Sequence, residues 1–331
     1  MKNFLLGVIT FALFSSTIQL AQATGLNLEK LNLKASDLKS KAVLITGASS
    51  GIGRSIAENL ADKGVFVYAG ARKQTDINEL SQHKNMLGIK LDVTKPNQIM
   101  AAVDLVKREG RGLHGLVNNA GVFFHSPLIE VSESDMQFMM DVNTFGPYRV
   151  TKAFAPLIIE SKGRVSNISS IAGIASSPLF GPYSMSKFAV EAFSESLYYE
   201  MKKFDVQVSV IEPGNFRSNI MKNMQKRLAL MESEDLPTQY KEEYKALAGF
   251  TAVDRSHHRD PIVVAEAVAQ ALFSDQAKFR YLVAPSQREA DLTTGAAIAK
   301  VVQLNSNHEF SVDKQTLLKR LDSALNPKPA E

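Results

Sequence analysis

Cysteine and tryptophan are both absent from this chain of 331 residues. The absence of cysteine excludes disulfides, thiolate catalysis and cysteine-ligated metal sites. An excess of either charge is also lacking, because the formal net charge is only +4. No basic run with interleaved aromatics indicates nucleic-acid binding. His257 and His258 stand beside Arg and Asp and are interpreted as part of a solvated loop, so we predict no metal site.

Long apolar runs are absent except near the N-terminus. There Lys2 precedes an apolar core at 4–14, and a polar-leaning stretch ends in the small-residue pattern AQA at 21–23. This layout predicts a secretory signal peptide over residues 1–23, removed by cleavage. An uncleaved membrane anchor through residues 4–23 and a buried N-terminal helix are the alternatives, although the core is shorter than the roughly 20 residues that span a bilayer. We therefore expect an exported or periplasmic protein, or one whose membrane contact is confined to this segment.

Strand and helix patterns alternate along most of the chain. Hydrophobic residues make up 45%, which is enough for a substantial core. After a polar linker at 24–40, strands are predicted at 42–45, 65–69, 87–91, 114–117, 165–168, 206–211 and 279–283. The alternation predicts an α/β fold, a single Rossmann-like doubly wound parallel sheet of about seven strands with helices on both faces, over residues 41–285.

Two segments depart from this alternation. Residues 216–260 are helical in pattern, charged and rich in methionine, and they follow the sixth strand at the edge where open α/β sheets bind ligands. They are predicted to form a substrate lid, or else an ordinary pair of surface helices. Residues 286–331 are predicted to form a C-terminal helical extension.

A glycine-rich turn directly follows the first predicted strand. Its sequence, TGASSGIG at 46–53, has the spacing GxxxGxG and leads into a helix predicted from about 54 to 63. Glycines let the backbone approach a pyrophosphate, and a helix N-terminus offers free amides and the positive end of its dipole. The turn therefore predicts a dinucleotide site. The predicted cofactor contacts in it are Gly47, Ser49, Ser50, Gly51, Ile52 and Gly53.

Arg72 lies just past the second predicted strand, with no acidic residue beside it. An acid at this position would bind the adenosine ribose hydroxyls and favour NAD, whereas a guanidinium suits the additional 2′-phosphate of NADP. We therefore expect NADP(H) to be favoured, with NAD(H) still possible. The alternative is a solvated arginine in a loop.

Ser170, Tyr183 and Lys187 lie close together in the sequence. Tyr183 and Lys187 are four residues apart, so they share one face of the predicted helix at 181–204. An ammonium beside the phenol would favour the phenolate and bring its pKa down from about 10. A hydroxyl at Ser170, after the fifth strand, could bind a carbonyl oxygen. Together these groups predict a device that interconverts an alcohol and a ketone, although the pair alone also fits an ordinary amphipathic helix.

These motifs together resemble the short-chain dehydrogenase/reductase family over about residues 41–285. TGASSGIG is similar to the family's cofactor turn, NNAG at 118–121 to its fourth-strand motif, and Pro213-Gly214 to its proline-glycine turn. Ser218 stands where many members have threonine. The lid and the segment 279–285 look most like the hydroxysteroid and retinol dehydrogenase branch. The residues that match the family's catalytic tetrad are Asn143, Ser170, Tyr183 and Lys187.

The resemblance implies a role for each member of the tetrad. Tyr183 would be the acid/base, and Lys187 would lower its pKa and hold the nicotinamide ribose. Ser170 would orient the substrate oxygen, and Asn143 would hold a water that relays protons from Lys187. The resemblance also implies a homodimer or homotetramer through the helices around Asn143 and Tyr183.

Further contacts follow from the same resemblance. Asp92 would contact the adenine, Asn119 would lie on the adenosine side of the cofactor, and Pro213 and Gly214 would complete the cofactor site. Phe180 would line the substrate pocket with Ser170 and Tyr183. We therefore predict an NADP(H)-dependent oxidoreductase that interconverts a secondary alcohol and a ketone or aldehyde, on a lipophilic small molecule.

Two other functions are considered. A non-catalytic dinucleotide-binding regulator would be expected to lack the tyrosine or the lysine, and a sugar-nucleotide epimerase would carry a differently spaced glycine turn. Export of the protein conflicts with the use of NADP, which is scarce outside the cytoplasm. An anchored protein with its domain on the cytoplasmic side, or cofactor bound before export, would resolve that conflict.

Overall fold

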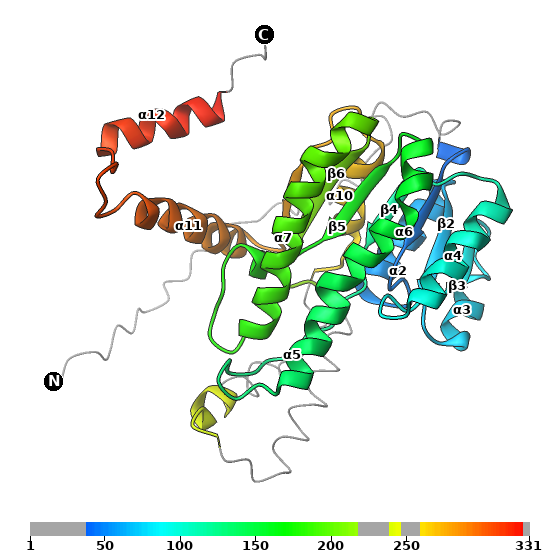
Figure 1. The fold of residues 1–331 in the computed structure, drawn as a ribbon, viewed down its shortest axis with the longest axis horizontal. Coiled ribbons are helices and arrows are strands. Elements are labelled where there is room, and N and C mark those ends of the chain that lie inside the picture. The colour runs from blue at the N-terminus through cyan, green and yellow to red at the C-terminus, as the bar shows by residue number, and fades with distance from the viewer. Residues whose placement is uncertain (1–37, 218–237, 246–258, 327–331) are drawn as a thin grey trace, which may run out of the picture.

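The seven strands in the described part of the chain lie parallel in one sheet, which confirms the predicted α/β fold (Figure 1). The computed structural model describes residues 38–217, 238–245 and 259–326. The strand order is β3-β2-β1-β4-β5-β6-β7. The strands are β1 Ala42–Ile45, β2 Phe66–Ala71, β3 Met86–Lys90, β4 Gly115–Asn118, β5 Arg164–Ile168, β6 Gln207–Pro213 and β7 Arg280–Val283.

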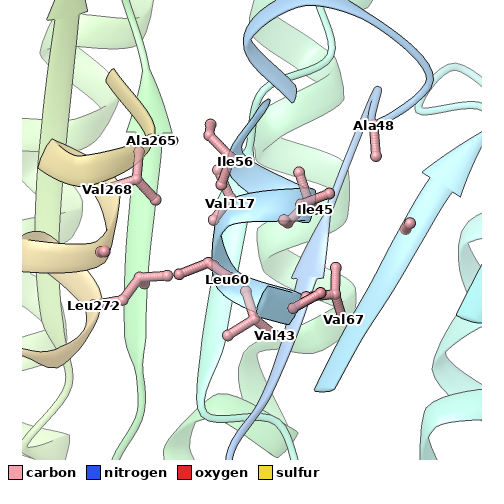
Figure 2. Packing of buried hydrophobic residues seen from close by; sticks show 14 of the residues in the cluster. Val43, Ile45, Ala48, Ile56, Leu60, Val67, Val117, Ala265, Val268 and Leu272 are labelled. Carbon is pink, nitrogen blue, oxygen red and sulfur yellow. The ribbon is translucent and has the colours of Figure 1, made fainter. Parts of the chain in front are cut away.

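Helices cover both faces of this sheet, so the central strands are buried on both sides. β1 has the sequence AVLI and is fully buried. On one face, the side chains of α2 and α10 pack on β1, β2 and β4 (Figure 2). On the other face, α4 and α6 close a second apolar cluster. The helices are α2 Gly51–Asp62, α3 Gln74–Leu80, α4 Pro96–Glu109, α5 Glu133–Met140, α6 Gly146–Glu160, α7 Gly181–Met201, α10 Ile262–Phe273, α11 Gln287–Leu304 and α12 Lys314–Leu325.

The chain reverses its direction of travel through the sheet between β1 and β4. It moves outward from β1 to β3, then returns to β4 on the other side of β1 and continues to β7. In open α/β sheets, ligands bind beyond the carboxyl ends of the strands at such a switch point. The glycine-rich turn follows β1, and NNAG overlaps the end of β4, so both meet there.

Three boundaries differ from the prediction in ways that affect the site. α2 begins at Gly51, so the last two glycines of the turn lie in its first turn. β6 extends through Pro213, which brings the proline-glycine turn to the end of that strand. The sequence at 132–159 is helical in pattern, but a π-helix, η2, at Asp141–Phe145 separates α5 from α6. Single-turn π segments inside helices occur frequently at functional sites.

Several predicted segments lie wholly or partly outside the described residues. These are the signal peptide or anchor, most of the linker, most of the lid with Ser218, His257 and His258, and the last five residues. Within the described ranges, no helix is both long and apolar enough to cross a membrane. α12 buries none of its residues and stands apart from the sheet layers in Figure 1.

Residues near the two ends of the segment 216–260 contact each other. The backbone amide of Arg217 donates to the carbonyl of Arg259 (3.2 Å), and the Arg217 guanidinium pairs with Asp260. Further along, Thr238 Oγ1 donates to a carboxylate oxygen of Glu130 (2.6 Å), in the loop before α5. Residues 217 and 259 are therefore neighbours although 41 residues (218–258) separate them in sequence.

Candidate active site

A cleft of about 1120 Å³ opens at the carboxyl ends of the strands. The segments that follow β1 to β6 line it, together with the first two turns of α11. Asn143 is the one predicted site residue that is not part of its lining. The predicted residues that do line it are Gly47, Ser49, Ser50, Gly51, Ile52, Gly53, Arg72, Asp92, Asn119, Ser170, Phe180, Tyr183, Lys187, Pro213 and Gly214.

The glycine-rich turn is pressed against the segment that follows β4. Gly47 has a φ of +66°, and a Cβ there would lie 2.8 Å from the Ala120 Cα atom. At Gly53 a Cβ would lie 2.3 Å from the side-chain nitrogen Nδ2 of Asn119. Ser50 is the N-cap of α2 and its hydroxyl makes no capping bond, so the first amides of that helix remain available to a ligand. These features fit the pyrophosphate of a dinucleotide.

Asn119 braces this turn from the side. Its amide nitrogen donates to the carbonyls of Thr46 (2.9 Å) and Gly47 (3.1 Å). The backbone amides of Asn119 and Ala120 both donate to the hydroxyl of Thr46, at 3.0 Å each. Asn119 therefore lines the cleft and also fixes the conformation of the turn.

Arg72 and Asp92 lie at the same end of the cleft. Arg72 is exposed and comes directly after β2, and its carbonyl accepts from the ammonium of Lys90. Asp92 Oδ1 accepts from the amide (2.9 Å) and the hydroxyl (2.8 Å) of Thr94, which holds the carboxylate in place. Two cations, Arg72 and Lys90, therefore lie near the position where a cofactor's adenosine ribose is expected.

Ser170, Tyr183 and Lys187 come together at the other end. Ser170 follows β5 as the N-cap of the short helix η3, Ile171–Gly173, and accepts from the Ala172 amide (3.1 Å). Tyr183 lies in the first turn of α7 and is hydrogen-bonded to the Ser170 side chain. Lys187 Nζ lies 5.6 Å from the Tyr183 ring centroid and donates to the carbonyl of Ile168 (2.8 Å).

The electrostatics of this pair correct one expectation. Burial raises the pKa of Tyr183 to about 12, and the hydrogen bond with Ser170 opposes that rise. Burial also lowers the pKa of Lys187 to about 8, against the effect of Glu191. The prediction that Lys187 brings the pKa of Tyr183 below its ordinary value is therefore wrong for these side chains, because desolvation of the phenolate dominates. Tyr183 is a neutral phenol at neutral pH, ready to donate a proton.

Asn143 lies behind the cleft, in the π-helix. Its side-chain oxygen accepts from the Val122 amide (2.8 Å), and its nitrogen donates to the Val122 carbonyl (2.9 Å) and the Ser186 hydroxyl (3.0 Å). A Cβ at Gly121 would lie 3.4 Å from Asn143 Oδ1 and 4.0 Å from Lys187 Nζ. Asn143 therefore ties the segment after β4 to α7, close to the ammonium of Lys187.

Three aromatic side chains beside Tyr183, those of Phe123, His125 and Phe180, form an aromatic wall of the cleft. The ring of Phe123 lies 4.7 Å from that of Tyr183 and 5.5 Å from that of Phe180, between centroids. The ring of His125 lies 4.4 Å from that of Phe180. The sequence analysis identified Phe180 but missed Phe123 and His125, although the run FFH two residues after NNAG was a signal for them.

α11 also contributes to the cleft, which the sequence analysis did not predict. Glu289, Leu292 and Thr293 line it. Glu289 Oε2 accepts from the backbone amide of Asn215 (2.9 Å), and a Cβ at Gly214 would lie 2.4 Å from that oxygen. The glycine in the proline-glycine turn therefore leaves room for the helix that follows β7.

The chain matches known proteins over most of this fold. The family profile described as short chain dehydrogenase matches residues 41–229. Mitochondrial D-beta-hydroxybutyrate dehydrogenase of Bos taurus is 42% identical over 187 residues, which span 54% of this chain and 54% of that enzyme. The chain thus spans about half the length of that relative.

Two other relatives match over a larger share. Dehydrogenase/reductase SDR family member 9 of Bos taurus is 35% identical over 270 residues, 76% of this chain and 82% of that protein. Retinol dehydrogenase 16 of Rattus norvegicus is 34% identical over 258 residues, 74% and 81% of the two chains.

Solved structures show the same fold. A short-chain dehydrogenase from Streptomyces avermitilis superposes with a TM-score of 0.67 at 30% identity, over 80% of this chain and 94% of that chain. One from Burkholderia phymatum, in complex with NAD, gives a TM-score of 0.67 at 26% identity, over 82% and 96%. The chain belongs to the short-chain dehydrogenase/reductase family, among its retinol and hydroxysteroid dehydrogenase type.

Proposed function

We propose that this protein is an NADP(H)-dependent oxidoreductase that interconverts a secondary alcohol and a ketone or aldehyde on a lipophilic small molecule. The observation that carries the proposal is the meeting of Ser170, Tyr183 and Lys187 in the cleft that also holds the glycine-rich turn. A proton donor and a dinucleotide site in one cavity are what such a reaction requires.

The cofactor would be held by the Gly47–Gly53 turn, the amides that open α2, and Arg72. When bound, a nicotinamide dinucleotide supplies or accepts the hydride. In the direction of reduction, Tyr183 gives its phenolic proton to the carbonyl oxygen of the substrate, and the Ser170 hydroxyl donates a hydrogen bond to that same oxygen. The ammonium of Lys187 stabilises the phenolate that remains. In oxidation the steps run in reverse, and the phenolate form of Tyr183, stabilised by the ammonium of Lys187, accepts the proton of the alcohol.

The lipophilic substrate is supported by the aromatic wall. Phe123, Phe180 and His125 face the cleft beside Tyr183, and Leu292 of α11 lines it as well. Apolar and aromatic linings with a few convergent polar groups are typical of sites for apolar small molecules. One relative is named as a retinol dehydrogenase, which agrees with this class of substrate.

Tyr183→Phe tests the function. With a panel of steroid, retinoid, aliphatic and sugar alcohols or ketones, it is expected to lower kcat by at least about 100-fold, because a general acid contributes about 10²–10⁴-fold. Binding of NADPH, followed by its fluorescence, should survive. Tyr199→Phe is the matched control, since Tyr199 lies on the same helix and is 62% exposed. Unchanged turnover in Tyr183→Phe would rule the proposal out.

We also propose that residues 216–260 form a substrate lid on the catalytic domain at 41–285. Its base is closed by the contacts of Arg217 with Arg259 and Asp260, and Phe216 lines the cleft. Replacing residues 218–258 with a short Gly/Ser linker should leave the circular dichroism spectrum native-like and raise KM for large apolar substrates. Unchanged KM values would contradict the lid.

A homodimer or homotetramer through α5, α6 and α7 is proposed as the assembled form. Exposed apolar side chains gather on these helices and on η2, which favours an interface there. They are Phe138, Phe145, Tyr148, Met185 and Phe188. Sedimentation velocity gives the mass in solution, and a monomer at micromolar concentration would count against this assembly.

Residues 1–23 are proposed as an export signal, with a membrane anchor as the alternative. Lys2 and the apolar core at 4–14 support both. The N-terminal residue of the protein recovered from its native host distinguishes them. A chain that begins at Met1 and partitions with membranes would favour the anchor.

A further inference from the structure

A cluster of charged side chains lies behind Lys187, in which Glu191 and Glu212 are buried and Arg280 is 41% exposed. Glu191 is one turn beyond Lys187 on α7 and is 9% exposed. Arg280, at the start of β7, places its Nη1 atom 2.6 Å from Glu191 Oε2 and also pairs with Glu212 of β6, whose side chain is fully buried. The mechanism described above uses Lys187 and none of these other three residues.

The four charges balance only when Lys187 is protonated. Arg280 and Lys187 contribute two positive charges, and Glu191 and Glu212 contribute two negative charges. Loss of the proton from Lys187 would leave one uncompensated negative charge among buried groups, which is costly in a medium of low polarity. The shifts agree with this. Burial lowers the pKa of Lys187 and Glu191 opposes that, while Lys187 opposes the rise that burial imposes on the pKa of Glu191.

The packing around Glu191 fixes where its carboxylate lies. A Cβ at Gly173 of η3 would lie 3.1 Å from Glu191 Cγ and 2.8 Å from Ser169 Oγ, so a glycine lets η3 close over this side chain. The Ser169 side chain opposes the rise that burial imposes on the pKa of Glu191. A glutamine would occupy the same space, so packing alone does not account for a carboxylate here.

Other titratable groups on the surrounding elements do not reproduce this balance. Asp141 of η2 is already paired with Arg149 (2.6 Å). Lys300 of α11 lies over the ring of Phe188, 4.5 Å from its centroid. The described titratable groups on these elements also include Tyr183 of α7, Glu133 and Asp135 of α5, Tyr281 of β7 and Glu289 of α11.

We propose that Glu191, held by Arg280 and Glu212, is a positioning residue that keeps the ammonium of Lys187 charged in the cleft and so sets the pH range of proton transfer through Tyr183. This rests on the proposed function, in which Lys187 supports Tyr183. Glu191 acts on the reaction only through Lys187 and touches neither substrate nor cofactor.

The test is the pH profile of kcat for carbonyl reduction. The charged form of Lys187 is the active one, so activity falls as pH rises through its pKa, which is about 8. Glu191→Gln removes the opposite charge, lowers that pKa, and should move the alkaline limb to lower pH by about one unit or more. KM should change less than kcat. Glu195→Gln, on the exposed face of the same helix, is the matched control and should leave the limb in place.

Arg280→Met is expected to shift the limb the other way. Without the guanidinium, the two carboxylates act on Lys187 unopposed, so its pKa rises and activity persists to higher pH. Glu191→Asp keeps the charge and should restore most of the wild-type profile. The proposal would be overturned if the alkaline limb of the kcat profile lay at the same pH in all variants. It would also be overturned if the limb moved in the same direction for Glu191→Gln and Arg280→Met, because a purely structural residue gives no opposite shifts. Arg280→Met also decides the matter should Glu191→Gln not fold.

A second readout needs neither substrate nor cofactor. The pKa of Lys187 falls from its ordinary 10.5 to about 8 on folding. Between these values the unfolded chain binds more protons, so the free energy of unfolding should rise with pH over this window. Urea denaturation should show that rise starting at lower pH in Glu191→Gln and absent in Lys187→Met. A rise that begins at the same pH in Glu191→Gln as in the wild type would refute the role of Glu191. This outcome does not depend on activity, whereas inactivity on every substrate would refute the proposed function.

Discussion

The two ends of the cleft differ in whether backbone or side chains form the binding groups. At the end near β1 and β2, the cofactor site is formed mainly by backbone. The turn depends on glycines packed against Ala120 and Asn119 and on the uncapped amides at the start of α2. At the end near β5 and α7, the site is formed by the side chains of Ser170, Tyr183 and Lys187. One end therefore tolerates no added atoms, whereas the other tolerates no change of chemical group.

After Tyr183→Phe, Ser170→Ala should give the largest effect at the side-chain end. It removes a hydroxyl that would bind the substrate oxygen, and loss of one such donor lowers kcat by about 10²–10³-fold. Steady-state kinetics with the best substrate of the panel measure this. Ser177→Ala, an exposed position lining the same cleft, serves as control and should keep wild-type kcat. Equal kcat in both variants would remove Ser170 from the site.

Gly53→Ala should give the next largest effect, on the backbone end. The new Cβ would lie 2.3 Å from Asn119 Nδ2 and 2.4 Å from the Gly47 carbonyl oxygen. Overpacking of this kind costs about 1–3 kcal/mol of unfolding free energy, and affinity for the dinucleotide should fall with it. Gly295→Ala on α11 meets nothing within 4 Å and should stabilise the helix by roughly 0.5–1 kcal/mol. Denaturant unfolding compares them, and destabilisation by both would mean that the crowding at Gly53 is not the cause.

Arg72→Ala should separate the two cofactors at the backbone end. A charge-assisted hydrogen bond to a phosphate is worth about 1.5–3 kcal/mol, so KM for NADPH should rise roughly tenfold or more while KM for NADH stays near its starting value. Lys73→Ala, its exposed neighbour outside the cleft lining, is the control. An equal loss for both cofactors would undo the preference for NADP.

Phe123→Ala should have the smallest effect, at the substrate side of the catalytic end. The ring packs at 4.7 Å from that of Tyr183, and losing an aromatic contact worth about 0.5–1.5 kcal/mol should raise KM for apolar substrates up to about tenfold with little change in kcat. Phe204→Ala, at the exposed end of η4, should change neither. A fall in kcat alone would indicate that Phe123 positions Tyr183 instead of binding substrate.

The same contrast explains what could be predicted from the sequence. The strands, the glycine turn and the spacing of Tyr183 and Lys187 are local patterns, and they gave the fold and part of the cleft lining. Glu289 and the Glu191–Arg280–Glu212 cluster depend on contacts between residues far apart in the chain, so no local pattern revealed them. The sign of the Tyr183 shift was wrong for the same reason. Spacing indicates which charge is near, but only the folded environment determines how strongly burial opposes it.

The contacts between Arg217 and residues 259–260 have a consequence for variation among relatives. The two ends of the segment 216–260 are joined by a hydrogen bond and an ion pair next to the sheet. The entropic cost of closing such a loop increases only slowly with its length, so insertions in it destabilise the sheet little. Residues 218–258 are thus the part of this protein that could be exchanged between homologues as a unit. Transplanting that segment from a relative would leave β6, α10 and the proton-transfer groups in place, so a change in the accepted substrates would support the lid proposed above.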